Sequence, residues 1–111
     1  PAPTAIICGN VRIARGVYQA LSALGLSIPG DVSVFAHDDH IAQLETAAFY
    51  PALSVTDAPL RDSWNPLADC LAQIIAGEPL SRAQMIGPHQ MILRQSTAPP
   101  RQQPGLSHTN R

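Results

Sequence analysis

The chain has 111 residues, of which 45% are hydrophobic and 14% charged, and its formal net charge is −1. This composition is typical of one small globular domain, and it excludes a disordered chain and a strongly basic surface for nucleic acids. No apolar run approaches the roughly 20 residues that span a bilayer. The two cysteines match no spacing of a small disulfide-stapled secreted scaffold, which favours a cytoplasmic protein.

The first part of the sequence predicts a strand, a helix and a second strand. Residues 4–8 (TAIIC) form a continuous apolar run, typical of a strand buried on both faces. Asn10 is a good helix N-cap, residues 11–24 repeat apolar positions at helical spacing, and Gly25 stops the helix. Residues 32–36 (VSVFA) follow as the next strand. Because strand, helix and strand succeed one another closely, we expect a βαβ unit with parallel strands.

The rest of the sequence predicts shorter elements and a tail. A short helix is expected over residues 41–48 and a short strand over residues 53–56. Apolar residues share one face from Leu67 to Ile75 and predict a longer helix, which Pro66 either kinks or starts after a short preceding turn. Two last segments are expected to be extended, residues 84–87 and 90–94. Residues 98–111 are rich in Pro, Gln and Ser and are expected to be flexible.

The segment HDDH, residues 37–40, comes directly after the second predicted strand. In open parallel sheets, ligands bind outside the carboxyl ends of the strands. Asn10 follows the first strand and Asp38 the second, so we expect these two side chains to line one cleft. An amide and a carboxylate together offer several hydrogen-bond donors and acceptors. Such a pair suits a polyhydroxylated or nucleobase-like ligand.

The same segment raises a metal-binding and a catalytic hypothesis. Adjacent residues of an extended strand point to opposite faces, so the four side chains cannot all meet one ion, although two of them with His89 could. No spacing typical of a zinc site is present. A catalytic pair of acids would need a nucleophile or substrate pocket nearby, and the chain supplies none. We therefore expect no metal, no cofactor and no enzymatic activity. The alternatives are a metal-dependent hydrolase that uses HDDH and, for Asp38 and Asp39, a solvated helix N-cap after the strand.

Four segments, in their order and spacing, resemble the C-terminal part of the lactose-repressor/galactose-repressor (LacI/GalR) family of bacterial transcription regulators: PTAIICGN, ALSALGLSIPGDVSV, PALSVTDAPL and MILRQSTAPP. The resemblance implies a periplasmic-binding-protein-like (type I) α/β fold, with parallel-sheet lobes around an effector cleft. Residues 1–97 would be the C-terminal part of this effector-binding domain, as a fragment of a longer chain. Residues 4–50 would lie mostly in the C-terminal lobe, residues 55–84 mostly in the N-terminal lobe, and residues 85–97 in a return strand.

The resemblance also implies site residues and partners. In the family, the asparagine after the first of these strands and the first acid after the second contact the effector, and they correspond to Asn10 and Asp38. The family dimerises partly through the C-terminal lobe, so Phe49 and Tyr50 are candidate interface anchors. The alternative is that both rings pack inside the lobe. DNA would be bound only through a helix-turn-helix region expected upstream of this chain.

The sequence departs from the family pattern near the expected cleft. Val11 stands where a polar residue is usual, and Ala58 stands where many members have a glutamine that lines the cleft. The prediction is the sugar-sensing part of a cytoplasmic, homodimeric transcription regulator, with an effector that differs from the family's commonest. A periplasmic solute-binding protein of a sugar transporter is the alternative function.

Overall fold

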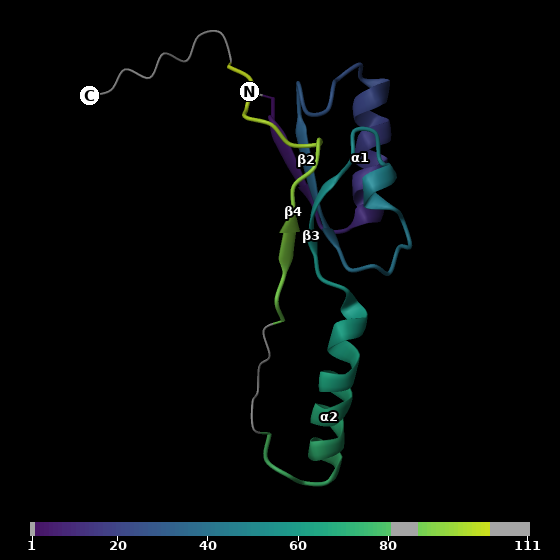
Figure 1. The fold of residues 1–111 in the computed structure, drawn as a ribbon, viewed down its shortest axis with the longest axis vertical. Helices are drawn as coiled ribbons and strands as arrows, with labels where there is room; N and C mark the ends of the chain where they lie inside the picture. Colours follow the sequence, from purple (N-terminus) through teal and green to yellow (C-terminus); the bar gives the residue numbers. More distant parts are fainter. Residues whose placement is uncertain (1, 81–86, 103–111) are drawn as a thin grey trace, which may run out of the picture.

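The computed structural model describes residues 2–80 and 87–102. Four strands form one sheet in the order β1-β2-β3-β4; they are β1 (Ala5–Cys8), β2 (Ser33–Asp38), β3 (Ser54–Asp57) and β4 (Gln90–Ile92). The helices are α1 (Val11–Ala23) and α2 (Trp64–Ile75), and two short 3-10 turns are η1 (Thr46–Ala48) and η2 (Leu60–Ser63). Figure 1 shows their arrangement. Within the described ranges, no helix has both the length and the apolar character needed to cross a membrane.

The predicted βαβ unit is present. β1 and β2 are parallel, with Cys8 opposite Ala36, and β3 extends the sheet in the same direction. Asn10 caps α1 as expected, because its Oδ1 accepts the backbone N–H of Ile13 at 2.9 Å. Gly25 follows the helix at φ +68°, a left-handed conformation that glycine adopts without steric cost.

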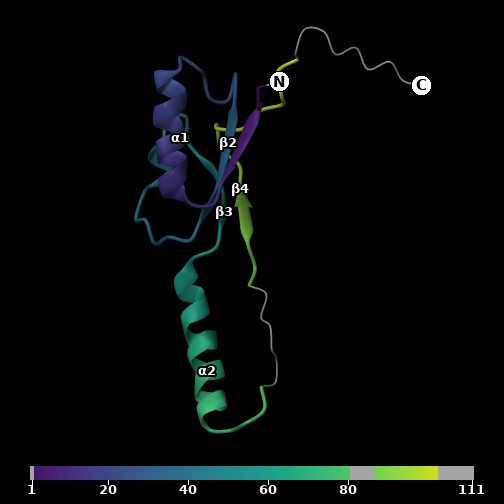
Figure 2. The same ribbon diagram turned by 180° about the vertical axis from the view of Figure 1, so that it is seen from behind.

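The hydrophobic core lies between α1 and one face of the sheet, and Figures 1 and 2 both show α1 beside that face. Its buried members are Cys8, Val11, Ala14, Leu21, Val32, Val34, Ala36, Leu53 and Val55. Ile7 in β1 points away from this core and is 82% exposed. The expectation that β1 is buried on both faces is therefore wrong within the described residues, because no element among them covers the second face.

The segment after β2 is less helical than predicted. Only Thr46–Ala48 of the expected helix over residues 41–48 forms a 3-10 turn. His40 and Gln43 adopt positive φ values of 61° and 51°, which interrupt any continuous helix. Farther along, η2 precedes α2, so Pro66 lies in the first turn of the helix. There its missing N–H removes no helical hydrogen bond.

The chain after α2 returns to the sheet. β4 is antiparallel to β3, with Thr56 opposite Met91. The predicted tail begins with anchored residues, since the Ala98 N–H donates to Ser33 Oγ at 3.0 Å and the Arg101 guanidinium contacts the Asp31 carboxylate at 2.8 Å. Residues 81–86 and 103–111, on which parts of the predicted lobes, return strand and tail fall, lie outside the described residues.

The molecule is elongated, because α2 does not pack on the sheet. Figures 1 and 2 show α2 extending beyond the end of β3, far from α1. None of the α2 residues is buried. The Cα radius of gyration is 19.4 Å, against about 13 Å for a compact domain of similar length.

Candidate functional site at the carboxyl edge of the sheet

Asn10 and Asp38 lie at the same edge of the sheet. The pairing of Cys8 with Ala36 puts each of them two residues beyond the last matched pair of β1 and β2. Asn10 is half-buried, and its Oδ1 is engaged in the α1 cap, so the side-chain NH₂ group is its remaining donor. Asp38 is 8% exposed. Among the described residues, no hydrogen bond joins the two side chains.

A second carboxylate, Asp57, faces Asp38 directly. The parallel register of β2 and β3 pairs these two residues at the ends of their strands. His40 turns back over them: its backbone N–H donates to Asp38 Oδ1 at 2.9 Å, and its Nε2 contacts Asp57 Oδ1 and lies 3.9 Å from Asp38 Oδ2. The hydrogen bond with Asp57 raises the pKa of His40 above its usual value, and the charge of Asp38 acts in the same direction.

Sequence reasoning did not find this cluster of Asp38, His40 and Asp57. The available signal was that two neighbouring parallel strands both end in an aspartate, at positions 38 and 57. That signal becomes a contact only through the strand register. As predicted, the four HDDH side chains do not share one site: Asp38 and His40 lie with Asp57, whereas His37 and Asp39 line a separate cavity.

The other face carries His37, whose Nδ1 lies 3.0 Å from Thr56 Oγ1. Its ring stacks on His89, with the ring centroids 5.4 Å apart and the planes at 26°. A cavity of about 470 Å³ opens here; its lining residues are His37, Asp39, Ala58, Pro59, Leu60, Asp62, Ser63, Gly87, Pro88 and His89. Asp39 therefore faces the cavity directly, whereas Asn10 and Asp38 are not part of its lining.

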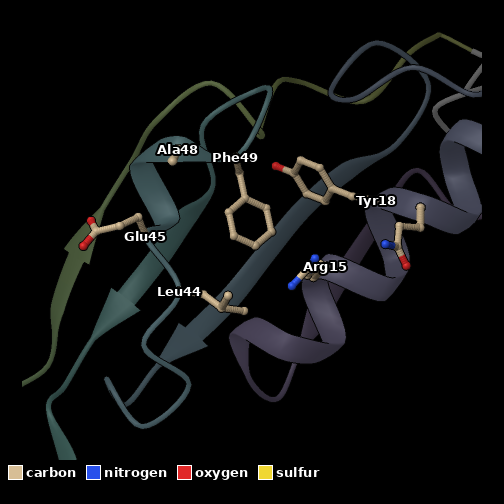
Figure 3. A pocket seen from close by; sticks show the side chains of 7 residues that line it. Arg15, Tyr18, Leu44, Glu45, Ala48 and Phe49 are labelled. Carbon is tan, nitrogen blue, oxygen red and sulfur yellow. The ribbon is translucent and has the colours of Figure 1, made fainter.

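Phe49 and Tyr50 lie in different environments. The half-buried Phe49 ring meets Tyr18 edge-on, with the centroids 5.1 Å apart, and the Tyr18 hydroxyl donates to the Pro51 carbonyl at 2.8 Å. Tyr50 is 97% exposed. Figure 3 shows Phe49, Tyr18 and Leu44 around a hollow between α1 and the η1 segment. This hollow has a volume of about 390 Å³. Phe49 thus packs within the domain, and Tyr50 projects from it.

The chain is similar to known proteins over most of its length. The sequence profile of the periplasmic binding protein-like domain matches residues 1–97. The transcriptional regulator AglR of Rhizobium meliloti is 32% identical over 97 residues, which are 87% of this chain and 27% of AglR. The lactose operon repressor of Rhizobium radiobacter is 35% identical over 99 residues, 88% of this chain and 83% of that sequence.

A solved structure shares the fold. A LacI family transcriptional regulator from Bifidobacterium animalis subsp. lactis superimposes with a TM-score of 0.73 and 27% identity, over 91% of this chain and 36% of that one. The chain therefore spans only about a quarter to a third of the length of AglR and of this regulator.

Proposed function

Because the chain belongs to the periplasmic binding protein-like domain family and, within it, to the LacI/GalR transcription regulators, we propose that it is the effector-sensing part of a DNA-binding regulator. The carrying observation is that Asn10 lies just beyond β1 and that Asp38 is the last residue of the adjacent parallel strand β2. Both residues therefore lie at the carboxyl edge of the sheet, where open α/β sheets bind ligands. The effector is a sugar or a related small molecule, whose hydroxyl groups pair with an amide and a carboxylate. The name of the lactose operon repressor supports a sugar.

The proposal divides the chain between two lobes. Residues 4–50 belong mostly to the C-terminal lobe, residues 55–84 mostly to the N-terminal lobe, and residues 85–97 lead back to the first. The protrusion of α2 beyond the sheet and the antiparallel return of β4 along β3 support this division.

Effector binding acts by shifting the closure of the lobes. The shift is passed to DNA-binding heads of the helix-turn-helix type, across a cytoplasmic homodimer. The chain itself contacts no DNA and performs no catalytic step. Its net charge of −1 supports the first of these statements, because affinity for DNA comes largely from neutralising phosphates with Lys and Arg.

The first prediction tests the effector site in the regulator that carries this chain, by calorimetric titration with lactose and a panel of other sugars. For the sugar that binds, Asp38→Ala should weaken binding by about 1–3 kcal/mol, because it leaves a buried polar group of the ligand without its partner. Asp39→Ala is the matched control and should cost much less. Equal losses from both substitutions, or no binding of any sugar, would contradict the assignment.

A further inference from the structure

We propose that Asp38, His40 and Asp57 bind a divalent first-row transition-metal cation such as Zn²⁺ at the carboxyl edge of the sheet. The three residues place their ligand atoms within 4.8 Å of one another. The proposal stands on this geometry and on the chemistry of the three side chains. It does not depend on which effector the protein senses.

The strand register brings two carboxylates together at this point. Asp38 and Asp57 are direct partners in the parallel ladder, so their carboxylates leave the sheet side by side on one face. Like charges directly opposite each other across two strands are destabilising. The His40 side chain pairs with both carboxylates and offsets part of this repulsion when it is protonated. A divalent cation held between the carboxylates would take over that role, and His40, having released its proton, would add a neutral nitrogen ligand.

The ligand set suits a metal of the zinc class. One imidazole nitrogen and two carboxylate oxygens are donors that Zn²⁺ and its neighbours accept, at bond lengths of roughly 2.0–2.2 Å. Ligand atoms around a tetrahedral ion of that size lie about 3.4 Å apart. The separation of 3.9 Å between His40 Nε2 and Asp38 Oδ2 is close to this value. The direct contact between His40 Nε2 and Asp57 Oδ1 must open by side-chain rotation to admit the ion.

The frame that carries the ligands is well fixed. The Ala58 N–H donates to the Asp38 carbonyl and the Leu60 N–H to the Asp39 carbonyl, both at 3.0 Å, which ties the chain after β3 to the end of β2. The Asp38 side chain is 11% exposed, that of Asp57 24% and that of His40 41%. The site is therefore closed on its inner side and open toward solvent through His40. Three protein ligands leave a coordination position for water or for an oxygen of a bound molecule.

The position gives the ion a structural consequence. Asp38 ends β2, and Asp57 ends β3 just before η2 and α2, which lead away from the sheet. A bound ion would brace the crossover between the two proposed lobes. This last consequence rests on the proposed function, whereas the ion site itself does not.

The experiment uses Zn²⁺ alone as the probe, titrated calorimetrically into protein that has been freed of metal with a chelator. We expect saturation at one Zn²⁺ per chain. His40→Asn and Asp57→Asn should each weaken binding by at least about tenfold, the scale on which even supporting residues of metal sites act. Asparagine tolerates the positive φ of residue 40, and His40 is exposed, so the fold should be retained, as circular dichroism will show.

His89→Asn is the matched control, because His89 is an exposed histidine on the other face of the sheet, stacked on His37. It should leave Zn²⁺ affinity unchanged. Absorption of the Co²⁺-substituted protein should change with His40→Asn and not with His89→Asn. The proposal is overturned if Zn²⁺ does not bind, if His89→Asn weakens binding as much as His40→Asn, or if folded His40→Asn and Asp57→Asn proteins bind as tightly as the original. Because no sugar is present, these outcomes are separate from failure of the effector proposal.

Discussion

At the scale of single residues, Asp31 holds a turn and the chain after β4 together. Its carboxylate accepts the backbone N–H of Ser27 at 2.8 Å and the Ser27 hydroxyl at 2.7 Å, and it contacts the Arg101 guanidinium at 2.8 Å. The backbone hydrogen bond from Ser27 lowers the pKa of Asp31 most, followed by the hydroxyl, and Arg101 acts in the same direction. The ionised carboxylate is therefore favoured by the folded chain.

The second prediction is that acid weakens the fold partly through Asp31. Because its folded-state pKa lies below the unfolded value of about 3.9, its stabilisation is complete above the unfolded pKa and is lost as pH falls through the folded pKa. Thermal melting between pH 6 and about pH 2.5 should show a smaller decrease for Asp31→Asn than for the unchanged chain. Asp62→Asn, which removes an exposed acid in η2, is the control. Parallel curves for all three proteins would refute the role of Asp31.

At the scale of elements, the segment after β4 joins β2 to β3 through buried side chains. Ser96, which is fully buried, accepts the backbone N–H of Ser54 at 2.8 Å and donates to the Val34 carbonyl at 2.6 Å. The Arg94 guanidinium donates to the Leu53 carbonyl at 2.6 Å. Residues 94–98 (RQSTA) thus hydrogen-bond to β2, β3 and the residue before β3, although they are not part of any strand.

The third prediction concerns Ser96→Ala, which leaves the buried Ser54 N–H without an acceptor. The free energy of unfolding should decrease by about 1–3 kcal/mol, the penalty for an unsatisfied buried donor. Urea unfolding would measure it. Gln95→Ala is the control, since Gln95 is exposed and its backbone bond to Ala52 is kept. A Ser96→Ala protein as stable as the Gln95→Ala protein would show that the network contributes nothing.

At the scale of the whole molecule, many large apolar side chains of the described residues are uncovered, and two places among them bear on assembly. Tyr50 projects from the sheet body, and α2 exposes Trp64, Leu67, Leu71, Ile74 and Ile75. Large exposed apolar surface marks an interaction site. Because Tyr50 and α2 lie on separate parts of the molecule, we expect them to contact different protein surfaces.

The fourth prediction separates Phe49 from Tyr50. Tyr50→Ala should shift the sedimentation of the regulator from dimer toward monomer with little change in unfolding, because an exposed aromatic ring carries interface energy and not core energy. Phe49→Ala should instead lower the free energy of unfolding by about 1–3 kcal/mol, less than the loss for a fully buried ring. An unchanged dimer in the Tyr50→Ala protein would remove Tyr50 from the interface.

The fifth prediction concerns the 111-residue chain on its own. We expect it to self-associate or to fold only partly, because no residue of α2 is buried and no element within residues 2–80 and 87–102 covers the second face of β1. Leu67→Glu combined with Leu71→Glu should reduce the association seen by sedimentation, whereas Asp69→Glu in the same helix should not. With seven basic and eight acidic residues, the chain should also fail to shift duplex DNA at moderate salt. A monomeric, cooperatively melting chain, or a steeply salt-dependent shift, would contradict these expectations.

The sequence by itself determined the local order of this protein. Asn10 marks the start of α1 and Gly25 its end, as predicted, and β1, α1 and β2 form the expected βαβ unit with parallel strands. These features were predictable because capping and apolar periodicity involve residues close together in the chain. It also placed Asn10 and Asp38 at one sheet edge, since parallel strands share the direction in which they end. The family was predicted from the order and spacing of four sequence segments, which does not require knowledge of any tertiary contact.

Only the tertiary structure decided which distant side chains meet. The Asp57 carboxylate contacts His40, which is 17 residues away in the sequence, and the Ser96 hydroxyl donates to the carbonyl of Val34, which is 62 residues away. Phe49 packs on Tyr18 while its neighbour Tyr50 stays exposed. No local pattern distinguishes these outcomes, because each depends on contacts between residues far apart in the sequence. For Asp38 and Asp57 the deciding feature is the strand register, since a slip of one residue would turn the side chains of a strand to the opposite face. The register of β2 against β3 therefore places the carboxylate of Asp57 beside that of Asp38.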